Sequence, residues 1–113
     1  ADAVRAHGRR VALIEADLAD AQALPGLIAQ AREALPNLAH LVNNASVFER
    51  APLEATGFEA SLASYTQHMD INLRAPVMLC QALHAALGEG GRGSVVNLLD
   101  THIRSYRHGF FHY

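Results

Sequence analysis

Short, nearly unbroken apolar runs divide the chain at regular intervals. They are VALIEA at 11–16, a run from about 39 to 43, and SVVNLL at 94–99. Runs of this length, bounded by polar or turn-forming residues, are typical of buried β-strands. The pattern therefore predicts three strands, each with both faces covered.

Between these runs, apolar residues recur every three or four positions, which is the spacing of one helix face. The first set is Leu24, Leu27, Ile28, Ala31 and Leu35, and the second, from about 59 to 87, is Leu62, Tyr65, Met69, Leu73, Val77, Cys80, Leu83 and Leu87. Asp20 is placed to cap the first helix and Pro36 to end it. The second helix is expected to end at GEGGRG, a glycine-rich loop.

The order strand, helix, strand, helix, strand predicts an α/β fold. Near-continuous apolar strands joined by helices favour a doubly wound parallel sheet with helices on both faces. With 113 residues and no internal repeat, residues 1–113 are expected to form a single domain.

Composition narrows the class of protein. A formal net charge of −2, with only scattered arginines such as Arg104 and Arg107, leaves no basic surface for nucleic acid. Cys80 is the single cysteine, which excludes an internal disulfide and favours a reducing compartment such as the cytoplasm. No apolar run approaches the roughly 20 residues that cross a bilayer. The N-terminal residues do not have the pattern of a signal peptide, so no membrane partner is expected.

Each predicted strand ends in polar residues: Asp17, Asn43 with Asn44, and Asp100. Taken singly, each is explained as a turn or helix cap, because Asn and Asp bond nearby backbone. In parallel sheets, however, ligands bind beyond the carboxyl ends of the strands. Three polar strand ends in one sheet therefore predict a ligand site at this edge.

Four motifs in this order resemble the central part of a short-chain dehydrogenase/reductase. They are NNAS at 43–46, INLRAP at 71–76, GSVVNLLD at 93–100, and Tyr113. The resemblance implies the central part of a Rossmann-like doubly wound fold. The family's glycine-rich dinucleotide loop would precede this sequence, and its catalytic lysine would follow Tyr113 by four residues. The sequence therefore resembles an internal piece of a longer subunit.

Two departures from the usual family pattern resemble the pteridine reductase branch. Ser46 stands where most members have glycine, with Phe48 two residues later, and Asp100 stands where most have serine. Asp100 also lies thirteen residues before Tyr113, as in that branch. The resemblance implies NADPH as cofactor and a pterin or dihydrofolate-type substrate.

The resemblance also implies which residues contact the cofactor. Asp17 and the Leu18 backbone would contact adenine, whereas Asn44 and Ala45 would hold the backbone against the adenosine side. Ser46 would bond pterin or cofactor phosphate. Without the resemblance, Asp17 is explained as a cap for the following helix.

For the substrate and the chemistry, the resemblance implies four further roles. Phe48 would stack on the flat pterin, although ordinary packing explains it when the resemblance is set aside. Tyr113 would donate a proton, assisted by a lysine outside this sequence, because an unassisted phenol is a weak acid. Asp100 would relay a proton to a ring nitrogen. Asn72 would interrupt the long helix and hold a water that leads to the lysine.

Two alternatives to a pterin reductase stay open: a reductase for another carbonyl or imine, and a non-catalytic relative. His108 and His112 have a spacing used in metal sites, but without a nearby carboxylate we expect contact with solvent or substrate, and no metal. Cys80 is expected to pack inertly. The long helix is apolar beyond its main stripe, at Met78, Leu79 and Ala82, which together with the family's assembly implies a homodimer or homotetramer.

Overall fold

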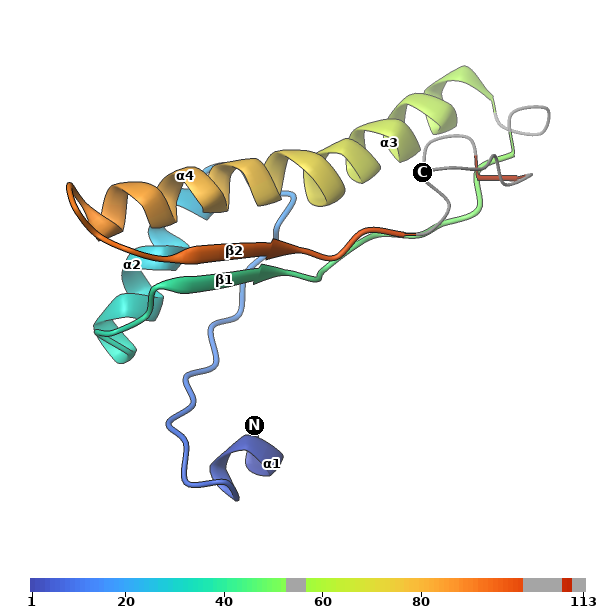
Figure 1. The fold of residues 1–113 in the computed structure, drawn as a ribbon. Coiled ribbons are helices and arrows are strands. Elements are labelled where there is room, and N and C mark those ends of the chain that lie inside the picture. The colour runs from blue at the N-terminus through green and yellow to red at the C-terminus, as the bar shows by residue number, and fades with distance from the viewer. Residues whose placement is uncertain (53–56, 101–108, 111–113) are drawn as a thin grey trace.

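The fold is known from a computed structural model that describes residues 1–52, 57–100 and 109–110. Its elements in chain order are α1 (Asp2–Arg5), α2 (Leu24–Ala34), β1 (His40–Asn43), α3 (Phe58–Met69), a π-helical turn η1 (Asp70–Arg74), α4 (Ala75–Leu87) and β2 (Ser94–Asn97). Helices α3 and α4 continue one another through η1; α4 runs alongside the two strands, and α3 extends beyond their carboxyl ends (Figure 1).

In the described part of the chain, the sheet consists of β1 and β2 in parallel, with His40 opposite Ser94 and Asn43 opposite Asn97. Their connection is the long α3–η1–α4 helix followed by the glycine-rich loop. Gly93 ends that loop where a Cβ would lie 2.3 Å from the Ala39 carbonyl oxygen, so only glycine fits without a shift of backbone. The predicted α/β architecture with a parallel sheet is confirmed.

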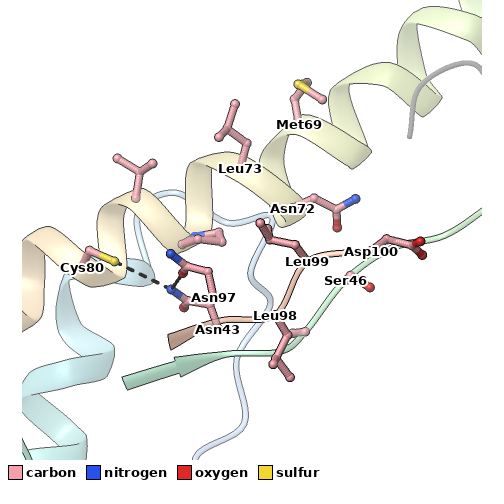
Figure 2. Close-up of a pocket in the computed structure, with 13 residues that line it drawn as sticks. Asn43, Ser46, Met69, Asn72, Leu73, Cys80, Asn97, Leu98, Leu99 and Asp100 are labelled. Atoms are coloured by element: carbon pink, nitrogen blue, oxygen red, sulfur yellow. Dashed lines mark hydrogen bonds between the residues drawn. The ribbon is translucent and has the colours of Figure 1, made fainter. Parts of the chain in front are cut away.

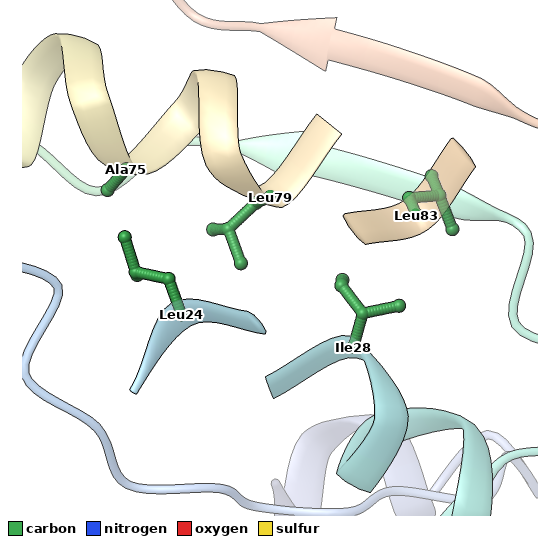
Figure 3. Packing of buried hydrophobic residues seen from close by; sticks show 5 residues of the cluster. All are labelled: Leu24, Ile28, Ala75, Leu79 and Leu83. Atoms are coloured by element: carbon green, nitrogen blue, oxygen red, sulfur yellow. The ribbon is translucent and has the colours of Figure 1, made fainter. Parts of the chain in front are cut away.

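The core lies between α2 and α4. Its buried side chains come from both helices: Leu24, Ile28, Ala75, Leu79 and Leu83 (Figure 3). Leu38 and Leu41 pack against this cluster, which joins β1 to the two helices. One face of the sheet is thereby covered.

The opposite face of the sheet is open among the described residues. Successive strand residues point to opposite faces, so Val42 and its partner Val96 lie on the side away from Leu41. Their exposed fractions are 58% and 48%. Helices on both faces were expected, but in the described part of the chain helical cover is found on one face.

The predicted strand at 11–16 is not a strand in the structure. No backbone hydrogen bond in the described part of the chain joins these residues to β1 or β2, and Leu13 is 76% exposed. A strand exists only as part of a hydrogen-bonded ladder, so an apolar run without a neighbouring strand stays an extended segment. In Figure 1 this segment passes the sheet as an irregular trace.

The helix boundaries differ from the prediction at one end. The N-cap of α2 is Ala23, three residues after the expected cap, and Pro25 lies in the first turn. Asp20 instead caps the preceding turn, where its carboxylate accepts from the Gln22 amide at 2.9 Å. The C-terminal prediction is confirmed, because Leu35 is the C-cap and Pro36 follows it.

The long helix is interrupted at η1, and proline supplies the physical reason. Pro76 has no amide hydrogen, so it cannot donate to the Asn72 carbonyl, its partner in a regular α-helix. The chain widens into a π turn at Asp70–Arg74 just before it. Asn72 thus lies where the helix is interrupted, as predicted.

The buried face of this helix is not the whole predicted stripe. Leu83 is 2% exposed, as expected, but Leu73 and Val77 are each 57% exposed. Leu79, predicted to lie outside the main stripe, is instead in the core against α2. Because the helix is apolar on more than one face, periodicity alone did not identify which face meets α2.

Candidate functional site

A cavity of about 600 Å³ lies between the strand ends and the long helix (Figure 2). Its lining residues come from three segments: Asn43, Ala45 and Ser46 after β1; Met69, Asn72, Leu73, Pro76, Val77 and Cys80 on the helix; and Asn97, Leu98, Leu99 and Asp100 after β2. The exposed part of the predicted helical stripe, Leu73 and Val77, thus forms one wall of the cavity.

A pair of amides joins the two strand ends at the base of the cavity. The Asn43 amide donates to the Asn97 Oδ1 at 2.7 Å, and the same nitrogen lies 3.7 Å from the Cys80 sulfur (Figure 2). Asn43 therefore joins the end of its strand to the neighbouring strand. Cys80 is half-buried and lines the cavity, and it is not part of the core between α2 and α4.

Asn72 fixes the segment that follows β1. Its Oδ1 accepts from the Val47 amide at 2.8 Å, and its Nδ2 donates to the Val47 carbonyl at 2.9 Å. These bonds replace the pairing that a neighbouring strand would give to Val47. The side chain thus joins the interrupted helix to the segment that carries Ser46.

Ser46 and Asp100 lie at the same end of the cavity, on the extended segments that follow β1 and β2 (Figure 2). The fold therefore brings together residues that are 54 positions apart in the sequence, with Asn72 on the wall beside them. A hydroxyl that donates and accepts, next to a carboxyl group, can orient a polar ligand and exchange a proton with it. The apolar lining suits a flat organic molecule more than a metal ion.

Phe48 comes two residues after Ser46 in the chain, but it does not line the cavity. Its ring stacks on that of Phe110, with centroids 4.3 Å apart and planes 5° apart, and 42% of the residue remains exposed. The pair is supported by backbone contact, because the Ala51 amide donates to the Gly109 carbonyl at 2.8 Å. The predicted stacking ring is thus present, and one of its faces is covered by another phenyl group.

Several predicted site residues lie away from the cavity. Asp17 accepts from the Ala19 amide at 2.8 Å, which stabilises a turn before α2; it is not the helix cap expected without the resemblance, because Ala23 is the N-cap of α2. Leu18 packs against the core, and Asn44 is exposed and does not line the cavity. Tyr113, together with His108 and His112, lies outside the described residues.

Sequence reasoning missed three residues around the site: His68, Asn97 and Phe110. His68 is fully buried and contacts the backbone of Glu49 and Ser64. The signal that could have found it is its position four residues before Asn72, on the same helix face. Asn97 is a polar residue inside an apolar strand, which is a sign of a partner or ligand.

Metal binding and membrane insertion are not supported by the described segments. Among residues 1–52, 57–100 and 109–110, no group of three or more His, Cys, Asp or Glu side chains could hold a metal ion. None of the helices in the same segments is long and apolar enough to cross a bilayer.

Comparison with known proteins identifies the family. The family model described as short chain dehydrogenase matches residues 1–113. An uncharacterized oxidoreductase of Methylorubrum extorquens is 32% identical over 97 residues, covering 86% of this chain and 37% of that protein.

Solved structures are similar over nearly the whole chain. FolM alternative dihydrofolate reductase 1 from Brucella canis, complexed with NADP, has a TM-score of 0.83 and 29% identity, covering 99% of this chain and 43% of that one. A blue fluorescent protein from a metagenomic library, in complex with NADPH, has a TM-score of 0.78 and 34% identity, covering 96% of this chain and 42% of that one. The chain thus spans about two-fifths of the length of the relatives it matches. With its parallel sheet and a family match over its full length, the chain belongs to the short-chain dehydrogenase family.

Proposed function

We propose that the full-length protein is an NADPH-dependent oxidoreductase that reduces a pterin or dihydrofolate-type substrate. The observation that carries the proposal is that Ser46 and Asp100, both unusual for the family, line the same end of one cavity. The similarity to a FolM alternative dihydrofolate reductase complexed with NADP supports the same substrate class.

The cavity offers a nicotinamide cofactor both hydrogen-bonding groups and apolar surface. Ala45 and Ser46 line it after β1, and Leu98 and Leu99 add apolar surface after β2. In the proposal, Ala45 and Ser46 contact the cofactor near its reactive end, and Asn44, Asp17 and Leu18 contact it toward the adenine. Bound NADPH would supply the hydride. Two similar solved structures are complexes with NADP or NADPH, which favours NADPH for this protein.

In this proposal, Asp100 and Tyr113 supply the proton that the substrate nitrogen receives. Reducing a C=N bond needs hydride on carbon and a proton on nitrogen, and a carboxylic acid can give up a proton whereas a serine hydroxyl does so poorly. Asp100 lines the cavity. Asn72 holds the segment that carries Ser46, and so keeps the hydroxyl and the carboxyl at one end.

Phe48 is proposed to stack on the flat substrate. Stacked aromatic rings attract one another beyond the area that they bury. Phe110 already stacks on Phe48 with nearly parallel rings. This contact supports the proposal that the Phe48 ring can stack on a flat molecule.

The substrate is tested by following NADPH absorbance with the full-length protein. We expect oxidation of NADPH with dihydropteridine or dihydrofolate substrates and little with simple ketones. Turnover of ketones without turnover of reduced pterins would instead support the alternative, a reductase for another carbonyl or imine.

Variants at the site test the roles of individual residues. Asp100→Asn and Asp100→Ser should lower turnover of a dihydropterin by ~10²-fold, the usual scale for loss of a general acid, while NADPH binding stays nearly unchanged. Tyr113→Phe should be at least as damaging. Phe48→Ala should raise KM more than it lowers kcat, because stacking stabilises ground state and transition state alike. Full turnover by Asp100→Asn would exclude the proton relay.

We also propose that the protein assembles as a homodimer or homotetramer and functions in a reducing compartment such as the cytoplasm. Apolar residues outside the cavity stay exposed along the long helix, such as Leu62 and Tyr65 at 49% each. A helix that is apolar on more than one face favours a second partner. A monomer by light scattering at micromolar concentration would contradict the assembly.

A further inference from the structure

His68 is the one polar residue that is fully buried in the described part of the chain. Its Nδ1 lies 2.8 Å from the Ser64 carbonyl oxygen, which can only accept, so Nδ1 carries the hydrogen. The other nitrogen, Nε2, is then an acceptor, and the Glu49 amide donates to it at 3.4 Å. Through these two contacts, His68 joins α3 to the segment after β1.

Asn72, four residues later, contacts the same segment. His68 receives the amide of Glu49 and Asn72 receives the amide of Val47. In an extended chain, alternate amides point to the same side, so these two side chains act on Val47 and Glu49 as a neighbouring strand would. Phe48 is the residue between the two anchored amides.

The other support of Phe48 is the segment at Gly109 and Phe110. The Ala51 amide donates to the Gly109 carbonyl, and Ala51 pairs with Phe110 as an isolated parallel bridge. The Phe110 ring then stacks on Phe48. Backbone contacts thus hold the chain on both sides of Phe48, and the Phe110 ring stacks on one face of its ring.

We propose that His68 is a positioning residue for substrate binding: with Phe110 as the backing ring, it presents Phe48 as a preorganised platform for a flat heterocycle. This inference rests on the proposed function for the identity of the heterocycle. Preorganisation matters because a ring that is fixed before binding loses less conformational freedom when the substrate stacks on it.

A matched pair of variants tests the contact to Glu49. The Asn side chain in His68→Asn can still donate to the Ser64 carbonyl from the position of Nδ1, but it is too short to reach the Glu49 amide. The longer side chain in His68→Gln places an acceptor near the position of Nε2. Ile28→Val, in the core between α2 and α4, controls for a general loss of stability.

In the full-length protein, His68→Asn should speed hydrogen exchange of the peptide that covers residues 47–51 by ~5-fold, the effect of losing a typical hydrogen bond. It should also raise KM for a dihydropterin by ~3–10-fold, the range of a lost stacking contact, with kcat and NADPH affinity nearly unchanged. His68→Gln should restore both properties, and Ile28→Val should change neither.

Unchanged exchange at 47–51 in His68→Asn would overturn the proposal. A faster exchange without a rise in KM, in a protein whose Phe48→Ala variant does show the rise, would overturn it too. If the wild-type protein turns over no pterin, the proposed function fails. The exchange comparison of His68→Asn with His68→Gln then still decides whether His68 holds Phe48.

Discussion

Replacing Asn72 with leucine should destabilise the protein measurably, because the amide makes a two-bond contact to one peptide group. Asn72 accepts from the Val47 amide at 2.8 Å and donates to the Val47 carbonyl at 2.9 Å. Leucine keeps a similar volume but leaves both half-buried backbone groups of Val47 without their partner. At ~1–3 kcal/mol for each unsatisfied group, partly relieved by water, the free energy of unfolding should fall by about 2–4 kcal/mol.

Asn72→Asp separates the two bonds. A carboxylate still accepts from the Val47 amide but cannot donate to the Val47 carbonyl, so the loss should be about half as large, roughly 1–2 kcal/mol. Gln67→Leu is the matched control, because it removes an exposed amide from α3 by the same chemical change. This control should stay within about 0.5 kcal/mol of the wild-type protein.

The assay is urea unfolding of the full-length proteins, followed by circular dichroism at equilibrium. The expected order of stability is wild type and Gln67→Leu, then Asn72→Asp, then Asn72→Leu, with similar m-values, because the surface exposed on unfolding is unchanged. A loss below about 1 kcal/mol for Asn72→Leu would refute the reasoning. Asn72 would then matter for activity alone, and other contacts would hold Val47.

Substitutions at a closely packed glycine, at a buried leucine and at an arginine give three more expected outcomes. Gly93→Ala should lower stability by about 1–3 kcal/mol or more, because its Cβ would meet the Ala39 carbonyl, while Gly26→Ala, whose Cβ would meet only the end of the Gln30 side chain at 3.6 Å, should not lower stability in the same urea assay. Leu24→Ala, at a fully buried position, should cost about 2–5 kcal/mol by urea unfolding, and a loss below about 1 kcal/mol would show that the site collapses around the smaller side chain. Arg74→Met should lower the thermal midpoint and Arg74→Lys should recover only part of the loss, since an ammonium cannot reproduce the planar fork that bonds the Ala19 carbonyl and an acidic neighbour. Complete recovery with lysine would contradict that account.

The predicted elements that formed are those whose backbone finds hydrogen-bond partners in the described part of the chain, although the one-turn helix α1 was not predicted. Helix α2, the long helix and both strands of the sheet correspond to their predicted patterns, because each pattern contains its own partners or pairs with another described element. The run at 11–16 has the same apolar signal, but its pairing depends on a neighbour that the described residues do not supply. Apolar content alone was therefore insufficient, because the hydrogen-bonded ladder decides whether a strand forms.

The site residues that directly follow a strand could be predicted from the sequence. Those whose roles depend on long-range contacts could not. Ser46 and Asp100 come directly after strands, so their meeting at one cavity follows from parallel topology. His68 and Phe110 could not be assigned in this way, because their roles arise from contacts with Glu49 and Phe48 across the fold. A buried histidine and a second phenylalanine have no periodic signal of their own.

Produced as an isolated peptide, residues 1–113 would place the Val42 and Val96 face of the sheet in water. A sheet of two strands is marginally stable by itself, and both of its outer edges can pair with other chains. Self-association through those edges would then compete with folding.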